Sequence, residues 1–161
     1  MIIIQWNCCG VTARLKELIY LVRKLGAEII LINETHLNEK KDLNIPGFVT
    51  FRVDRANASH ASGGVAILVK NSIRIDGEIY SHQTAMSEWL AIKIINKVGK
   101  PLIIATGYRS PSEELDLTFL DSVFNGLLYN RDGTRCIFGG DLDATLGHLQ
   151  EPTEPVLQSS L

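Results

Sequence analysis

Four polar side chains that could bind a metal ion and a phosphate follow apolar runs in this sequence. They are Asn7, Glu34, Tyr108 and Asp141. Mg²⁺ prefers oxygen ligands and keeps several waters, so one or two protein carboxylates plus a substrate phosphate suffice to hold it. Such a metal would polarise a phosphoryl oxygen and stabilise the leaving oxygen. If the four strands lie side by side, these residues form a site for a hard cation and a phosphate at one rim of a sheet.

Each of these residues also has an ordinary structural interpretation. Glu34 could be a solvated carboxylate, Asn7 a turn former, and Tyr108 a half-buried aromatic with a wet hydroxyl. Asp141 could cap a turn after Gly140. Taken singly, the ordinary interpretation is the better one each time, and only the joint arrangement favours a site. The glycines that precede Tyr108 and Asp141 are expected to let the backbone come close to a ligand.

The elements that position these residues follow from the apolar periodicity, which predicts short strands with two helices between them. Strands are expected at residues 2–6, 28–32, 48–53, 64–70, 73–80, 87–95, 101–107 and 134–138, and helices at 12–25 and from 110 to about 129. Thr12 is expected to cap the first helix at its start and Gly26 at its end. Alternation in the strand at 87–95 places Glu88 on the face opposite Trp89.

Composition restricts the function classes only loosely. The chain has 161 residues, 45% hydrophobic and 21% charged, with a net charge of -2. A dedicated nucleic-acid binder is usually strongly basic, but an acidic metal site with a local basic patch is compatible with this charge. No apolar run approaches a membrane span. The three cysteines, Cys8, Cys9 and Cys136, lack zinc-finger spacing and are expected to be reduced, mostly buried thiols of an intracellular protein.

The segments that carry these residues resemble motifs of the endonuclease/exonuclease/phosphatase superfamily, which includes apurinic-site endonucleases, DNase I-like nucleases and the endonuclease domains of LINE-type retrotransposons. They occur in the family's order between residue 2 and about residue 147. The segments are Gln5-Trp6-Asn7-Cys8, Asn33-Glu34-Thr35-His36-Leu37, Gly63-Gly64-Val65-Ala66-Ile67, Ser87-Glu88-Trp89-Leu90-Ala91-Ile92, Gly107-Tyr108-Arg109-Ser110-Pro111 and Gly140-Asp141-Leu142-Asp143-Ala144. The first and third favour the non-LTR retrotransposon branch.

The resemblance implies an α+β fold, a two-sheet αββα sandwich of the DNase I type. Residues 1–147 would form this domain, incomplete at its C-terminal side, and the composition of residues 148–161 is typical of a flexible tail. The implied activity is a phosphodiester hydrolase that nicks DNA with Mg²⁺ or Mn²⁺. DNA is the implied partner, a reverse transcriptase domain in the parent polyprotein is a second, and the implied location is the nucleus.

The resemblance also implies roles for individual residues. Glu34 would bind the metal and Asn7 would support the metal-phosphate end. Tyr108 would contact the phosphate, Asp141 would orient the attacking water, and Asp143 would complete the catalytic group. Arg109 is expected to contact phosphate or DNA, and Arg52 and Arg55 to help steer DNA.

Two departures from the family pattern leave alternatives open. The family has Asn where this chain has Asp143, and an ionised Asp cannot donate a hydrogen bond to a phosphate. The family's closing strands, with a Ser-Asp-His motif, have no counterpart here, and none of His36, His60, His82 and His148 matches a catalytic histidine. The alternatives are an inactive relic, or a phosphatase or phosphodiesterase of the same superfamily. Missing strands would leave exposed edges, so marginal stability or self-association is expected.

Overall fold

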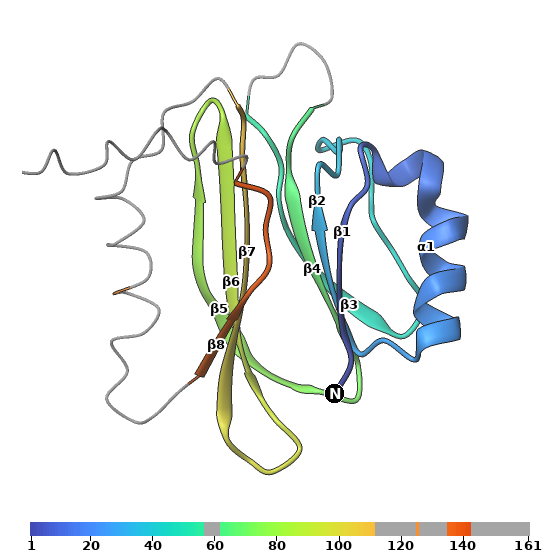
Figure 1. Cartoon of the computed structure of the whole chain (residues 1–161), viewed down its shortest axis with the longest axis vertical. Helices are drawn as coiled ribbons and strands as arrows, with labels where there is room; N and C mark the ends of the chain where they lie inside the picture. The colour runs from blue at the N-terminus through green and yellow to red at the C-terminus, as the bar shows by residue number, and fades with distance from the viewer. Residues whose placement is uncertain (57–61, 112–124, 126–134, 143–161) are drawn as a thin grey trace, which may run out of the picture.

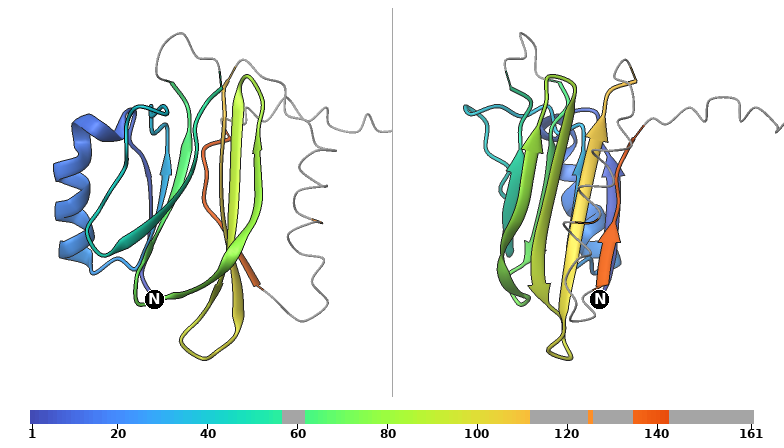
Figure 2. Two further views of the ribbon diagram at one scale, coloured as in Figure 1. Left: turned by 180° about the vertical axis from the view of Figure 1, so that it is seen from behind. Right: turned by 90° about the vertical axis from the view of Figure 1, so that its left-hand side faces the viewer.

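The computed structural model describes residues 1–56, 62–111, 125 and 135–142 (Figure 1). Its elements are β1 (Ile3–Asn7), α1 (Val11–Leu25), β2 (Ile29–Asn33), β3 (Phe48–Val53), β4 (Val65–Lys70), β5 (Arg74–Gln83), β6 (Ser87–Ile95), β7 (Pro101–Arg109) and β8 (Arg135–Phe138). They form a first sheet with the order β1-β2-β4-β3 and a second sheet with the order β5-β6-β7-β8. The two sheets lie face to face, and α1 lies outside the first sheet (Figures 1 and 2).

The strand directions bring the strand ends that carry Asn7, Glu34, Tyr108 and Asp141 to one rim. β1 runs parallel to β2, so that Asn7 stands opposite Asn33 where both strands end. β8 runs parallel to β7, and just beyond β8 an isolated bridge pairs Asp141 with Tyr108. The remaining neighbours are antiparallel.

The apolar core is built by strands that are covered on both faces. In β2, Ile30 and Ile32 pack toward α1, whereas Ile29 and Leu31 pack toward the second sheet. A strand buried on both faces lacks the alternation of a half-exposed one, which explains the continuous apolar run. From the other side, Leu90, Ile92, Ile94, Leu102 and Ile104 fill the space between the sheets. The predicted alternation of the strand at 87–95 is therefore confirmed.

The start of α1 differs from the prediction. The helix begins at Val11 after Gly10 and has no side-chain cap, so the expected cap by Thr12 is wrong. The amides of Gly10 and Val11 instead donate to the carbonyl oxygens of Glu34 and Thr35, at 2.8 and 3.0 Å. Because these backbone groups satisfy donors at the helix start, no hydroxyl is needed there. The predicted cap at the other end is confirmed, since Gly26 is left-handed with φ of 65°.

The strand predictions differ from the structure only at their ends. β7 continues to Arg109, two residues beyond the predicted end, and β5 extends to Gln83 with two register shifts. The second predicted helix, from 110 to about 129, and the predicted tail at 148–161 lie outside the described residues, apart from Ser110, Pro111 and Asn125. One helical layer and two sheets of the expected αββα sandwich are thus observed. Within the described residues, no helix combines the length and apolar character needed to cross a membrane.

Candidate metal and phosphate site

The four strand-end residues meet at the rim shared by the two sheets. The Asn7 Nδ2 atom donates to Glu34 Oε1 at 3.0 Å and to Asp141 Oδ2 at 2.6 Å. Asn7 and Glu34 come from the first sheet, whereas Asp141 follows the second, so one amide joins carboxylates from both sheets. These contacts place the strand-end residues together, as the sequence pattern predicts. Their roles as metal, catalytic and phosphate residues stay predictions.

The donor set of this cluster fits a hard divalent cation. Glu34 and Asp141 offer carboxylate oxygens, and the Asn7 side chain carries an amide oxygen, which are the ligand types that Mg²⁺ and Mn²⁺ accept. The Glu34 and Asp141 carboxylates accept from the same amide nitrogen, so their negative charges lie close together. A bound cation would reduce the repulsion between them. Glu34 retains 22% side-chain exposure, so an ion and its waters can reach it.

Tyr108 stands within electrostatic reach of both carboxylates. Burial is the largest cause of a raised pKa for its phenol, and the negative charges of Glu34 and Asp141 raise the pKa further. Arg55 opposes them, with its guanidinium carbon 5.3 Å from the centre of the Tyr108 ring. A phenol whose pKa is at or above its ordinary value of 10.0 is protonated at neutral pH, so Tyr108 can donate a hydrogen bond to a phosphate oxygen.

Backbone hydrogen bonds fix Asp141 beside β7. The Asp141 amide donates to the Gly107 carbonyl, and the Arg109 amide donates to the Asp141 carbonyl, both at 3.0 Å. Arg109 is only 6% exposed, and its Nε donates to the Leu142 carbonyl at 2.7 Å. This guanidinium thus holds the segment that follows β8. The predicted contact of Arg109 with DNA stays a prediction.

Asn33 connects the two sheets and was missed as a site residue. Its fully buried amide donates to the Gly107 carbonyl at 2.9 Å and to the Thr106 hydroxyl at 3.2 Å. The Asn33 oxygen accepts a hydrogen bond from Gln5 Nε2 at 2.9 Å. A polar residue that ends an otherwise apolar buried strand was the available signal, because a buried amide has to find partners.

A buried ion pair supports the same rim and was also missed. The Glu88 carboxylate is fully buried and lies 2.6 Å from Arg55 Nε, and it also accepts the Gly64 amide at 3.1 Å. Arg55 therefore joins the sheets and flanks Tyr108. Arg52 pairs with Asp54 at 3.3 Å. Steering of DNA by these two arginines stays a prediction.

The glycines of the motifs are packed closely against other atoms of the protein. A Cβ on Gly140 would lie 2.5 Å from the Gly107 carbonyl oxygen, and a Cβ on Gly107 would lie 2.5 Å from the Trp89 ring. Gly64, with φ of 84°, would drive a Cβ into the Thr35 hydroxyl. The expectation that the glycines before Tyr108 and Asp141 make room for a ligand is replaced by this close packing of β6, β7 and the Asp141 segment.

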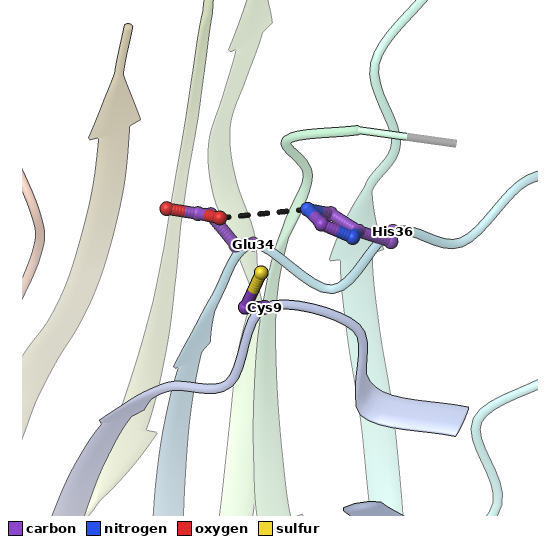
Figure 3. A group of neighbouring side chains, drawn as sticks. All are labelled: Cys9, Glu34 and His36. Atoms are coloured by element: carbon purple, nitrogen blue, oxygen red, sulfur yellow. Dashed lines mark ion pairs between the residues drawn. The ribbon is translucent and has the colours of Figure 1, made fainter. Parts of the chain in front are cut away.

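A second group of side chains gathers around Glu34. His36 Nε2 lies 3.5 Å from Glu34 Oε2, and the Cys9 sulfur is directed toward this pair (Figure 3). Cys9 is exposed, which corrects the expectation of mostly buried thiols, whereas Cys8 is buried and Cys136 is partly buried. Burial raises the pKa of Cys8 to about 11. All three cysteines are free, as predicted.

Three predicted or discussed residues lie outside the described part of the chain, namely Asp143, His60 and His148. His82 lies on β5 with its ring 6.3 Å from that of Tyr80. His82 also lines a pocket of about 890 Å³ that shares Arg55 with the rim and includes Lys40 and Arg52. Asn7, Glu34 and Asp141 do not line this pocket.

Comparison with protein families supports the motif order. The model described as the Endonuclease/Exonuclease/phosphatase family matches residues 4–150. A probable RNA-directed DNA polymerase from transposon X-element of Drosophila melanogaster is 35% identical over 71 residues, which is 44% of this chain and 8% of that protein. The RNA-directed DNA polymerase from mobile element jockey of Drosophila funebris is 25% identical over 142 residues, which is 86% of this chain and 14% of that protein.

Solved structures support the fold. The APE2 catalytic domain of Xenopus laevis matches with a TM-score of 0.64 and 17% identity, over 90% of this chain and 59% of that chain. TDP2 of D. rerio, complexed with single strand DNA product, matches with a TM-score of 0.59 and 15% identity, over 89% of this chain and 60% of that chain. The chain thus spans about three-fifths of these solved chains and a small part of the polymerases.

Replacing Asn33 with Leu should lower the free energy of unfolding by about 1–3 kcal/mol, because the Gly107 carbonyl and the Gln5 amide would lose a partner at a buried position. Urea unfolding monitored by circular dichroism measures this change. Asn71→Ala, at an exposed turn position, is the control and should stay within about 0.5 kcal/mol of the wild type. An Asn33 variant as stable as that control would contradict the bridging role.

Replacing Glu34 with Gln should lower the pKa of Tyr108, because one of the negative charges that raise it is removed. NMR titration of ring-labelled tyrosine in the presence of a chelator measures the shift. Tyr80 is the internal control, since burial alone raises its pKa. Because folding raises the pKa of the Tyr108 phenol, this group's contribution to the free energy of unfolding is complete below the pKa of the unfolded chain. The contribution is lost as pH rises through the pKa of the folded chain. If the pKa values of Tyr80 and Tyr108 shift equally, the substitution has rearranged the second sheet and the result would contradict a direct effect of the Glu34 charge.

Proposed function

This chain belongs to the endonuclease/exonuclease/phosphatase family, and we propose that its site hydrolyses DNA phosphodiester bonds with Mg²⁺ or Mn²⁺ as the endonuclease region of a non-LTR retrotransposon protein. The observation that carries this proposal is the Asn7 amide, which holds the Glu34 and Asp141 carboxylates together beside Tyr108. The match to mobile-element polymerases supports the retrotransposon source. Attachment to a reverse transcriptase domain and a nuclear location are part of the same proposal.

In the proposed hydrolysis, the metal and each side chain act at different atoms of the phosphodiester and of the attacking water. Mg²⁺ at Glu34 would supply positive charge to the phosphoryl and leaving oxygens. The Asp141 carboxylate accepts a hydrogen bond from the attacking water and aligns it with the phosphorus atom. The protonated Tyr108 phenol donates to a phosphate oxygen. The water oxygen bonds to phosphorus as the bond to the 3′-oxygen breaks. The attacking water loses one proton to the solvent and the leaving 3′-oxygen takes one up, so that a 3′-hydroxyl and a 5′-phosphate remain.

Asn7 and Arg109 act in this proposal as positioning residues. Asn7 keeps the two carboxylates at a fixed separation, and Arg109 holds the segment after β8 that carries Asp141. Small displacements of reacting groups reduce catalytic rates steeply, so the rigidity of this rim matters as much as the identity of its carboxylates. DNA would approach through phosphate contacts, which are sequence-independent and salt-sensitive.

The central test is nicking of supercoiled plasmid by the purified chain in Mg²⁺. Glu34→Gln should reduce the rate by about 100-fold or more and EDTA should abolish it, because the carboxylate and the metal act as one catalytic unit. Asn71→Ala is the matched control and should nick like the wild type. Metal-dependent nicking that survives Glu34→Gln would remove this site from the mechanism. No nicking by a demonstrably folded chain would favour the inactive relic, and phosphate release from small esters without nicking would favour a phosphatase.

By the resemblance, Asp143 takes the place of an Asn that donates to the phosphate, and an ionised carboxylate there would repel it. Replacing Asp143 with Asn should therefore increase nicking by about 10-fold or more. Initial nicking rates at fixed Mg²⁺ measure the effect. Asp143→Ala separates the two causes, because it removes the repulsion without adding a donor and should give an intermediate rate. If the Asn variant is no faster than the Ala variant, the hydrogen bond contributes nothing.

A further inference from the structure

Cys9, Glu34 and His36 bring three different ligand types to one place. Within the described residues, one sulfur, one carboxylate oxygen and one imidazole nitrogen lie within 4.8 Å of one another. Cys9 comes from the loop between β1 and α1, whereas Glu34 and His36 follow β2 (Figure 3). The side chains of Glu34 and His36 are partly exposed, at 22% and 25%, and Cys9 is exposed, so that an ion in solution can reach all three.

The spacing suits tetrahedral coordination. Two nitrogen or oxygen ligands at roughly 2.0–2.2 Å from a tetrahedral Zn²⁺ lie about 3.4 Å apart. The distance between His36 Nε2 and Glu34 Oε2 is 3.5 Å, so this pair needs little movement to share an ion. The sulfur of Cys9 can approach by a rotation of its exposed side chain, since no packing holds an exposed thiol in one rotamer.

The backbone holds all three residues in an unusual conformation. Among the described non-glycine residues, positive φ occurs at these three positions, with values of 44° at Cys9, 53° at Glu34 and 51° at His36. Such conformations cost of order 1 kcal/mol each and persist only where surrounding contacts maintain them. The Glu34 carbonyl accepts the Gly10 amide at 2.8 Å, and the His36 amide donates to Gly63 at 3.0 Å. These contacts fix the backbone at Glu34 and His36 before any ion arrives.

We propose that Cys9, Glu34 and His36 form a binding site for Zn²⁺ and similar borderline-soft metals. Thiolate and imidazole ligands favour such ions over Mg²⁺, which prefers oxygen alone. Three protein ligands leave a fourth position open for water. Glu34 also belongs to the oxygen cluster with Asn7 and Asp141, so that Zn²⁺ at this site withdraws the carboxylate from that cluster. Resting on the proposed function, this makes Zn²⁺ an inhibitor that competes with Mg²⁺.

The binding test uses Cd²⁺ as a probe on the purified full chain, without DNA. Cd²⁺ should give the ultraviolet charge-transfer absorption of a bound thiolate in the wild type and in Cys136→Ser, which keeps Cys9 and removes a distant thiol. The absorption should vanish in Cys9→Ser. His36→Gln should weaken Cd²⁺ binding by about 10-fold or more, since loss of a group that only orients a ligand already costs about that much. Added Zn²⁺ should displace Cd²⁺, and excess Mg²⁺ should not.

Two results would overturn the site. One is an unchanged absorption in Cys9→Ser, and the other is its absence in a wild type shown to be folded by circular dichroism. Because this readout needs no catalysis, a chain that binds Cd²⁺ but does not nick DNA would contradict the proposed function and retain the metal site. In a chain that nicks, Zn²⁺ should inhibit the wild type at least about 10-fold more strongly than Cys9→Ser, each compared with its own zinc-free rate. Equal inhibition would overturn the competition at Glu34.

Discussion

The Asn33 side chain crosses from the first sheet to the second and donates to the Gly107 carbonyl and the Thr106 hydroxyl. The apolar side chains between the sheets provide most of the attraction, but apolar contacts are non-directional and do not fix how one sheet slides over the other. A buried amide has defined directions, and leaving its partners unsatisfied costs about 1–3 kcal/mol. The amide therefore selects one relative position of β2 and β7. The site depends on that position, since Glu34 follows β2 and Tyr108 lies on β7.

The Glu88–Arg55 pair constrains the same rim from another direction. Glu88 is fully buried, and separating it from Arg55 would leave an uncompensated charge, which costs far more than the pair contributes when formed. Its second oxygen holds the Gly64 amide, and the Gly64 and Gly63 carbonyls accept the Thr35 and His36 amides. A charge on the second sheet thus orients the loop that follows β2. The backbone next to Glu34 and at His36 is thus hydrogen-bonded to residues that this connection between the sheets holds.

The strands and the strand-end residues could be predicted because both are local properties of the sequence. A buried strand such as β2 shows an apolar run, and the polar residue that ends it is visible beside it. The roles of Asn33 and Glu88, and the reason for Gly107 and Gly140, could not be predicted because they depend on which atoms of the other strands lie opposite. The cap of α1 was missed for the same reason, since the Glu34 and Thr35 carbonyls that replace it are distant in sequence.

Glu34 shows how one residue can belong to two ligand environments. One carboxylate oxygen accepts from Asn7 on the side of Asp141, and the other faces His36 and Cys9. The first side offers oxygen ligands and the second offers nitrogen and sulfur, so the two sides differ in the ions they favour while sharing one negative charge. A single carboxylate cannot neutralise two divalent ions, so an ion bound on one side would weaken binding on the other. The left-handed backbone at Glu34 directs its side chain between both groups, and the inter-sheet contacts maintain that backbone.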